Sequence, residues 1–160
     1  MTKNTKPEPA VKVDDATLLQ VLNFIGIANQ LAVTRANQVL AAGSLPFPQF
    51  VMLSHFSKDP KRPRTVTGIA SAFQAPQPGI TKTVQKMVRR GFLEARPDAE
   101  DGRSKHLFMT KAGAAAFAKA NTALAPSARK AFADWPEADI LTLHRLLRRL
   151  KDWLDDNRDG

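Results

Sequence analysis

Four polar side chains in the stretch ITKTVQKMVRRG have the types and spacing to contact the edges of DNA bases. At about 100° per residue, the apolar residues of this stretch fall on one side of a helix. The polar residues fall on the other side: Lys82, Gln85, Lys86 and Arg89. Lysine and glutamine hydrogen-bond base edges in the major groove, and at the N-terminal flank, beside Gly79, Thr81 could contact a thymine methyl group or a phosphate. An ordinary amphipathic helix with a solvated basic face would show the same pattern.

Three acidic residues crowd before an arginine in the stretch RPDAEDGRSKHLFMTKAG, where Asp98, Glu100 and Asp101 precede Gly102 and Arg103. The Asp101-Gly102 pair favours a hairpin turn, so FLEAR and SKHLFMT are predicted to be two short strands. An arginine at the tip of such a hairpin can enter a narrow minor groove, where the negative potential is enhanced. We expect Gly102 to permit the turn and Asp101 to hold a backbone amide or a basic side chain, which would aim Arg103. A solvated turn is the alternative.

The positive charge of the chain is concentrated in its middle. The formal net charge is +9, and residues 45–110 hold eleven basic and five acidic side chains, a net of +6. The flanking segments 1–44 and 111–160 have nets of only +1 and +2. A basic centre between nearly neutral ends indicates a module that faces a polyanion, although a solubilising surface would have the same composition.

The residue types give little support for catalysis or metal binding. The chain has no cysteine, which excludes disulfides, thiolate chemistry and cysteine-ligated zinc. His55, His106 and His144 lack a metal-binding spacing, and the acids near residue 100 do not follow a calcium-loop pattern. Neither a phosphate loop nor a serine nucleophile motif is present, so we expect no enzyme activity, no cofactor and no metal site.

Length and the N-terminal residues predict a single domain in the cytoplasm. A chain of 160 residues is long enough to bury one core. We find no run of about 18 apolar residues, so a membrane span is not expected. The first residues, MTKNTKPEPAVKV, lack the apolar centre of a signal peptide and are predicted to form a flexible tail, residues 1–13.

Apolar periodicity and capping residues predict six helices and one hairpin. Asp14 or Asp15 is expected to cap a long helix that ends near Gly43. The segment SKDPKRPR is predicted to be a basic loop, because Pro60 and Pro63 interrupt any helix. The other helices are predicted near residues 46–57, from a Thr65 cap through Phe73, over 79–91 with Gly91 as the C-terminal stop, over 111–133, and from Pro136 onward.

This order describes a mainly α chain with a small β-hairpin. The short helix from Thr65, a tight turn and the basic helix over 79–91 form a helix-turn-helix. The hairpin that follows has the place of a wing. A basic helix, a hairpin and an arginine at its tip together form a far more specific pattern than any one of them.

These residues resemble the MarR family of bacterial transcriptional regulators. The resemblance spans roughly residues 14–155 in element order and is sharpest from PQFVMLSHF through FMTKAG. ITKTVQKMVRRGFLEAR is similar to the family's recognition helix and first wing strand. The Asp-x-Arg of the family's wing stands here as Asp101 and Arg103, and its Thr-x-x-Gly helix start as Thr110 and Gly113.

Three departures from the family pattern lie around the helix-turn-helix. Gly68 replaces a common acidic residue, so a capping box with Thr65 is lost. Gln74 replaces a common turn glycine. Pro76 and Pro78 give the turn an unusual sequence, which leaves the start of the basic helix open.

The resemblance implies a winged helix-turn-helix protein with N- and C-terminal dimerisation helices, in which a homodimer reads the halves of a pseudo-palindromic operator in double-stranded DNA. The apolar stripes of the first and last helices are broad enough for mutual burial, and a dimer would space its recognition helices by about 34 Å. The implied divisions are a flexible tail 1–13, a dimerisation helix 14–44, a winged helix-turn-helix DNA-binding domain 45–110 and C-terminal dimerisation helices 111–157.

Carried over by position, the resemblance also assigns contacts. Thr81, Lys82, Gln85 and Lys86 would face the major groove and Arg103 the minor groove, while Lys105 and the 58–64 loop would meet phosphates. Gly79 and Arg89 complete the expected DNA-binding surface.

The expected function is sequence-specific transcriptional regulation, most often repression in this family, relieved by a small aromatic or anionic effector. Family members bind such effectors between the DNA-binding and dimerisation parts, and the candidate pocket residues here are Arg35, Phe47, Phe50 and His55. Plain core packing is the alternative for the phenylalanines. Two other functions stay open: a non-specific architectural DNA binder, and a ligand- or protein-binding module that has lost DNA binding.

Overall fold

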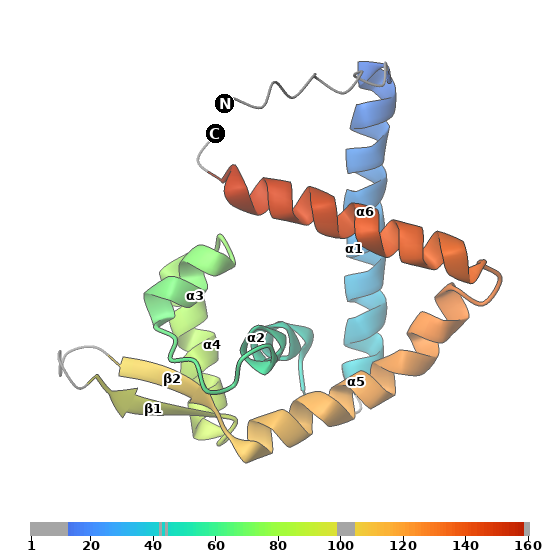
Figure 1. The fold of residues 1–160 in the computed structure, drawn as a ribbon. Helices are drawn as coiled ribbons and strands as arrows, with labels where there is room; N and C mark the ends of the chain where they lie inside the picture. The colour runs from blue at the N-terminus through green and yellow to red at the C-terminus, as the bar shows by residue number, and fades with distance from the viewer. Residues whose placement is uncertain (1–12, 42, 44, 99–104, 159–160) are drawn as a thin grey trace, which may run out of the picture.

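The computed structural model describes residues 13–41, 43, 45–98 and 105–158. These residues form helices and one antiparallel hairpin in the predicted order (Figure 1). The elements are α1 Asp15–Ala41, α2 Phe47–Ser57, α3 Val66–Ala72, α4 Gln77–Arg89, β1 Leu93–Pro97, β2 Lys105–Met109, α5 Lys111–Ala131 and α6 Glu137–Asp156. The fold is therefore mainly α with a small hairpin, as the sequence predicts.

Side-chain caps and prolines set where the helices begin. The Asp14 carboxylate accepts the Thr17 N–H at 2.7 Å at the start of α1. The Thr65 hydroxyl accepts the Gly68 N–H at 3.1 Å, so α3 keeps its N-terminal cap although an acidic residue at position 68 is missing. Helix α4 begins at Gln77, two residues earlier than predicted, because Pro78 occupies the first turn, where a missing N–H costs nothing.

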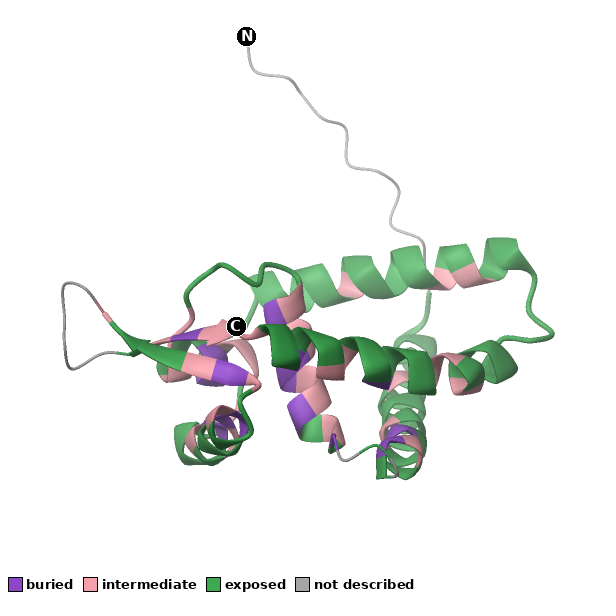
Figure 2. Cartoon of the chain, turned by 90° about the horizontal axis from the view of Figure 1, so that it is seen from below, coloured by how far each residue is buried: buried purple, intermediate pink, exposed green. Residues whose placement is uncertain are grey.

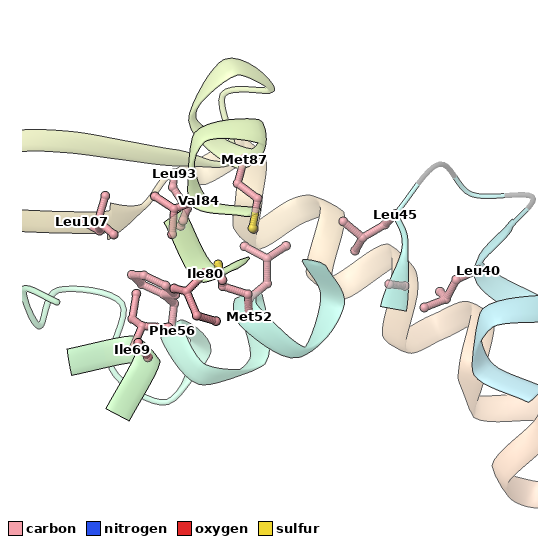
Figure 3. Packing of buried hydrophobic residues seen from close by; sticks show 13 residues of the cluster. Leu40, Leu45, Met52, Phe56, Ile69, Ile80, Val84, Met87, Leu93 and Leu107 are labelled. Atoms are coloured by element: carbon pink, nitrogen blue, oxygen red, sulfur yellow. The ribbon is translucent and has the colours of Figure 1, made fainter. Parts of the chain in front are cut away.

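The core lies between α2, α3, α4 and the hairpin (Figure 3). Phe56 and Met52 of α2 lie almost fully buried at its centre. Apolar residues of the neighbouring elements close around them: Ile69 of α3, Ile80, Val84 and Met87 of α4, Leu93 of β1 and Leu107 of β2. Because α4 buries one face here, its opposite face is left to solvent.

The hairpin pairs β1 with β2 in antiparallel register, from Leu93 opposite Met109 to Pro97 opposite Lys105. Leu93 and Leu107 face the core, and the alternation of a strand places Glu94, Arg96 and His106 on the outer face. The predicted strands are confirmed. The turn between them, with Asp101, Gly102 and Arg103, lies outside the described residues.

The start of α5 is docked closely onto the end of α4. Gly91 has a φ of +69° and follows the last turn of α4, as predicted. The Thr110 hydroxyl donates to the Gly91 carbonyl at 2.6 Å and accepts the Gly113 N–H at 3.0 Å. A Cβ atom on Gly113 would lie 2.2 Å from the carbonyl oxygen of Phe92, so only glycine allows this approach.

Helices α1 and α6 contribute little to the core. Helix α1 lies outside the lobe that α2, α3, α4 and the hairpin form, and α6 runs back so that its C-terminal end lies near α3 (Figure 1). None of the residues of α6, all of which are described, is buried, and α1 buries only Ala36 and Leu40. Figure 2 shows long stretches of helix with almost no buried residue. Large apolar side chains stand exposed on both helices, with Phe24 at 64%, Leu31 at 65% and Trp153 at 61%.

Helix α1 is long and largely apolar, although the sequence contains no continuous apolar run. Within the described part of the chain, α1 is the one helix that is long and apolar enough to cross a membrane by length and composition. Polar residues interrupt it, among them Gln20, Asn23 and Asn29, which is why no continuous apolar run is visible in the sequence. A second apolar helix packed against this surface would bury the same residues.

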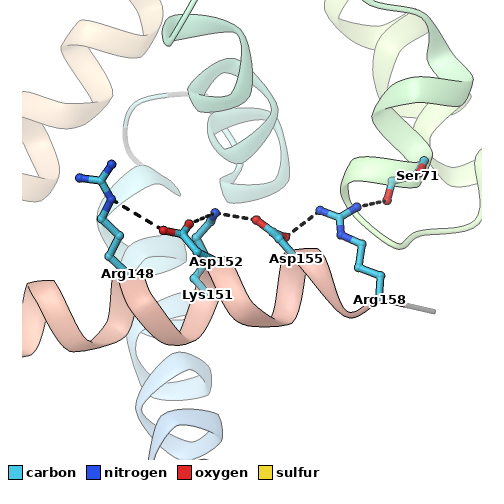
Figure 4. A network of polar contacts seen from close by, with 6 residues as sticks. All are labelled: Ser71, Arg148, Lys151, Asp152, Asp155 and Arg158. Carbon is cyan, nitrogen blue, oxygen red and sulfur yellow. Dashed lines mark hydrogen bonds and ion pairs between the residues drawn. The ribbon is translucent and has the colours of Figure 1, made fainter. Parts of the chain in front are cut away.

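The C-terminal end of α6 is tied to α3 by a chain of polar contacts (Figure 4). The Arg158 guanidinium donates to the Ser71 carbonyl at 3.1 Å and to the Asp155 carboxylate at 2.7 Å. Lys151 approaches Asp155 at 2.5 Å. Hydrogen bonds from Lys151 and then Arg158 lower the pKa of Asp155 to about 2, so this carboxylate stays charged well into acid.

Candidate nucleic-acid interface

The outward face of α4 carries the polar residues that the sequence singles out. Ile80, Val84 and Met87 are buried. The residues predicted to contact DNA from this helix are exposed, except for half-buried Thr81: Gly79, Lys82, Gln85, Lys86 and Arg89. The predicted amphipathic pattern is confirmed, while contact with DNA stays a prediction.

A cleft joins this face of α4 to the second strand of the wing. Its volume is about 360 Å³, and Thr81, Gln85 and Arg89 line it together with Lys105 of β2. The Thr81 hydroxyl donates to the Gln77 carbonyl at 2.9 Å, so its hydrogen is used within the helix and its methyl group is left for other contacts. The structure thus brings four of the predicted contact residues to one surface.

The turn between α3 and α4 uses a residue that usually avoids this conformation. Gln74 has a φ of 46°, in the left-handed region that favours glycine. The N–H of Ala75 donates to the Ala70 carbonyl at 3.0 Å, which closes the turn after α3. Gln74 therefore adopts the conformation expected of the glycine that it replaces.

The basic loop before α3 is held by one of its own arginines. The Arg64 guanidinium donates to the carbonyls of His55, Asp59 and Arg62 at 2.9, 2.9 and 3.0 Å. It also lies 4.9 Å from the centroid of the Phe56 ring. Arg64 therefore acts inside the protein, and the exposed cations of the predicted phosphate-contacting loop are Lys58, Lys61 and Arg62. This division could not be predicted from the sequence, because all four side chains carry the same charge.

The outer face of the hairpin carries two charged contacts. The Arg96 guanidinium pairs with the Glu94 carboxylate and lies 4.6 Å from the centroid of the Phe108 ring. Nearer the turn, His106 Nε2 lies 3.1 Å from Asp98 Oδ2. From the sequence, Asp98 was assigned to an acidic cluster, and its pairing with His106 was not predicted. The register of the two predicted strands could have suggested this pairing.

The four candidate effector residues lie in different surroundings. Phe50 stacks with Phe47 and with Phe117 of α5, at centroid distances of 6.0 and 5.2 Å, and all three pack against the core. The His55 ring lies edge-on to Phe73 at 5.4 Å, and Arg35 is exposed on α1. The core packing considered for the phenylalanines is therefore present, and an effector pocket stays a prediction.

Charge around His55 affects its protonation. Burial lowers the pKa of this histidine, and the positive charges of Arg64, Lys58 and Arg62 lower it further. His55 lines a cavity of about 320 Å³ with Arg62 and Arg64. Within the described ranges, no group of three or more His, Asp or Glu side chains is arranged to hold a metal ion.

The fold and this surface define a winged helix-turn-helix protein. Residues 44–104 match the sequence model of the MarR family. Three solved structures share the fold over most of the chain. BldR from Sulfolobus solfataricus is 23% identical with a TM-score of 0.70, over 86% of this chain and 99% of that chain. A MarR family protein from Bacillus stearothermophilus is 15% identical with a TM-score of 0.74, over 89% of this chain and 99% of that chain.

The third structure is a mutant of MarR from E. coli complexed with operator DNA, which is 18% identical with a TM-score of 0.69, over 86% of this chain and 99% of that chain. No curated protein matches the chain. The family match over the lobe and the shared fold over the whole chain agree with each other. The part of the chain from residue 44 to 104 matches the MarR family model, and the chain has the fold of solved MarR family proteins.

Proposed function

We propose that this protein is a sequence-specific, DNA-binding transcriptional regulator that acts as a homodimer in the cytoplasm. The observation that carries the proposal is the exposed basic face of α4, which continues across a cleft to Lys105 of the wing. A helix with such a face fits the major groove, and cations beside it neutralise phosphates. The E. coli MarR structure that shares this fold holds operator DNA, which supports the same use here.

The homodimer is supported by the apolar surface of the two long scaffold helices. Monomeric soluble proteins rarely expose large contiguous apolar surfaces. Here α6 buries none of its own described residues, and α1 exposes Phe24 and Leu31. A second copy that covers these helices would bury them and would place two α4 helices on one side of the assembly. The two would then fit half-sites one DNA turn apart, about 34 Å.

Within each lobe, we assign base contacts to α4 and phosphate contacts to the surrounding cations. Lys82 and Gln85 are exposed at the centre of the face and carry donors for base edges. Thr81 and Lys86 would face the same groove, and Arg89, Lys105 and the exposed loop lysines are suited to phosphates. Arg103 would enter the minor groove, with Asp101 and Gly102 shaping the turn that holds it. On this account Asp101→Ala weakens DNA binding although it makes the protein more positive.

Regulation follows the pattern expected of the family. The protein would act as a repressor that a small aromatic or anionic effector releases from its operator, with Arg35, Phe47, Phe50 and His55 as the first residues to test. Oxidation of cysteine is excluded as the signal, because the sequence contains none.

The proposal is tested by titrating the protein against genomic fragments at several salt concentrations. We expect a few fragments to bind well above bulk DNA, with an affinity that falls as salt rises. Lys82→Ala should lower this preference, whereas Lys119→Ala, which changes an exposed lysine on α5, should leave it intact. Equal affinity for all sequences would instead show a non-specific architectural DNA binder. Retained ligand binding without any DNA binding would show a ligand- or protein-binding module that has lost DNA binding.

A further inference from the structure

The residues at the end of α6 reach across to the last turn of α3 (Figure 4). Arg158 lies just beyond α6, and its Nη1 donates to the Ser71 carbonyl at 3.1 Å. Its Nη2 donates to Asp155 Oδ1 at 2.7 Å, and the other oxygen of that carboxylate lies 2.5 Å from Lys151 Nζ. The guanidinium of Arg158 therefore holds α3 through one nitrogen, while α6 holds it through the other.

The Ser71 carbonyl belongs to the turn that leads from α3 into α4. It also accepts the Gln74 N–H at 3.1 Å, and the Ala75 N–H donates to the Ala70 carbonyl at 3.0 Å. Gln74 has a φ of 46°, and a residue other than glycine keeps such a left-handed conformation only where the surrounding contacts hold it. Arg158 supplies one such contact from outside the turn, because it adds a charged donor to the carbonyl on which the turn closes.

A cleft lies between the turn and α6 beside this contact. Its volume is about 450 Å³, and its lining includes apolar side chains of α1 and α6 and two residues of the turn: Ile25, Leu150, Leu154, Phe73 and Gln74. Because the turn faces a cleft here and not a filled core, packing alone leaves it room to move. Arg158 also lines the cleft, so its contact with Ser71 spans one edge and limits that movement.

We propose that the end of α6 braces the turn between α3 and α4, with Arg158 and Asp155 as positioning residues for α4. Arg158 holds the carbonyl on which the turn closes, and Asp155 holds the guanidinium of Arg158 in place. The brace is a property of the folded chain, whereas its effect on DNA rests on the proposed function. Neither residue needs to touch DNA, because each acts through the position of α4.

The loss of a cation would also weaken DNA binding by reducing general attraction, without any brace. Two variants that change the charge in opposite directions separate these causes. Arg158→Ala removes a positive charge, and Asp155→Asn removes a negative one. If general attraction alone decides, Asp155→Asn binds DNA more tightly than wild type. If the brace positions α4, both variants lose roughly two- to five-fold in affinity for a genomic fragment that wild type prefers over bulk DNA.

The control for the lost charge is Arg145→Ala, which changes an exposed arginine earlier on α6. All variants are compared at one salt concentration, and we expect the control to stay within about two-fold of wild type. Tighter binding by Asp155→Asn, or an equal loss in Arg158→Ala and Arg145→Ala, would overturn the positioning role.

Hydrogen exchange of single amides measures the brace in the free protein, without DNA. After correction for intrinsic exchange, Arg158→Ala should speed exchange of the Gln74 and Ala75 amides roughly three- to ten-fold, while amides in the middle of α2 stay within about two-fold. A variant that simply destabilised the whole protein would speed both sets alike. Unchanged exchange at Gln74 and Ala75, or the same effect from Arg145→Ala, would overturn the brace.

Gln74→Gly provides a rescue, because glycine adopts the left-handed conformation without strain. In this background the turn needs less support from α6, and Arg158→Ala should change exchange of the Ala75 amide by less than about two-fold. An undiminished effect would show that Arg158 does not act through the turn, and would overturn the brace. The expected exchange pattern in a protein that prefers no genomic fragment would instead refute the proposed function and leave the brace.

Discussion

Arg64 and Leu107 exchange two backbone hydrogen bonds, which join the basic loop to the second strand of the wing. The Leu107 N–H donates to the Arg64 carbonyl at 2.7 Å, and the Arg64 N–H donates to the Leu107 carbonyl at 3.3 Å. The side chain of the same arginine reaches the His55 carbonyl near the end of α2. One residue thus links α2, the loop and the wing, which makes the elements around α4 a single unit.

Removing the Arg64 side chain should destabilise this unit. Arg64→Ala leaves three carbonyls without their charged donor, and we expect the free energy of unfolding to fall by about 2 kcal/mol. Arg62→Ala is the matched control, because this neighbouring side chain is exposed and its loss should change stability by less than about 0.5 kcal/mol. Chemical denaturation at one protein concentration measures both. Equal effects of the two substitutions would show that Arg64 has no special structural part.

The lowered pKa of His55 predicts how stability depends on pH. Because burial and nearby cations disfavour the charged ring in the folded state, the unfolded chain binds the proton more readily. This contribution is fully present above the ordinary histidine pKa of about 6.5 and is lost as the pH falls through the lower folded value. Unfolding at a series of pH values should show the decline in wild type and a flatter profile in His55→Gln. An equally steep decline in the variant would assign the effect to other groups.

Two glycines should respond to alanine in opposite ways. In Gly113→Ala the new Cβ would collide with the Phe92 carbonyl oxygen, and we expect a loss of about 2–3 kcal/mol in unfolding free energy. In Gly79→Ala no atom lies within 4 Å of the new Cβ, and a helix gains up to about 1 kcal/mol from this change. Thermal and chemical denaturation distinguish the two. If Gly113→Ala is as stable as wild type, α5 does not approach Phe92 as closely as the structure shows.

Substitutions on the proposed DNA-binding surface should separate specificity from general affinity. Gln85→Ala should reduce discrimination between bases at one position of each half-site by about 1–3 kcal/mol. Lys61→Ala, in the basic loop, should weaken binding to all sequences alike and lower the salt slope by about one. Affinities for a panel of operator variants at several salt concentrations measure both effects. A uniform loss for Gln85→Ala would move this residue from base contacts to general attraction.

Charge on the apolar surface of α1 should prevent self-association. Leu31 is 65% exposed in the single chain, and Leu31→Glu would place a carboxylate in the proposed interface, where it has no partner. We expect sedimentation to show a dimer for wild type and a monomer for the variant. Gln30→Glu is a control for added charge on a neighbouring exposed position. A monomeric wild-type protein would remove the basis for reading two half-sites.

The sequence could predict the elements because their ends carry local signals. Asp14, Thr65, Thr110 and Gly91 act within one turn of the helix that they start or stop, so their effect does not depend on the rest of the fold. The apolar and polar faces of α4 were likewise visible in the sequence, because the apolar residues recur at helical spacing and the core buries that side of the helix. The start of α4 was predicted two residues late, because Pro76 and Pro78 fit either side of a helix start.

What the sequence could not show depends on contacts between distant segments. Arg64 carries the same charge as the other loop cations, and only the backbone carbonyls around it reveal that it acts inside the protein. The pairing of Asp98 with His106 depends on the register of the hairpin. The apolar stripe of α1 would look the same in a core and in an interface, and the structure is needed to show that most of it is exposed.

Selection of bound DNA from a random pool tests the central claim most directly. A homodimer that presents two α4 helices predicts enrichment of a two-fold symmetric motif, with half-sites about 10 bp apart. The absence of any enriched motif, or a single asymmetric site bound by one chain, would contradict the account.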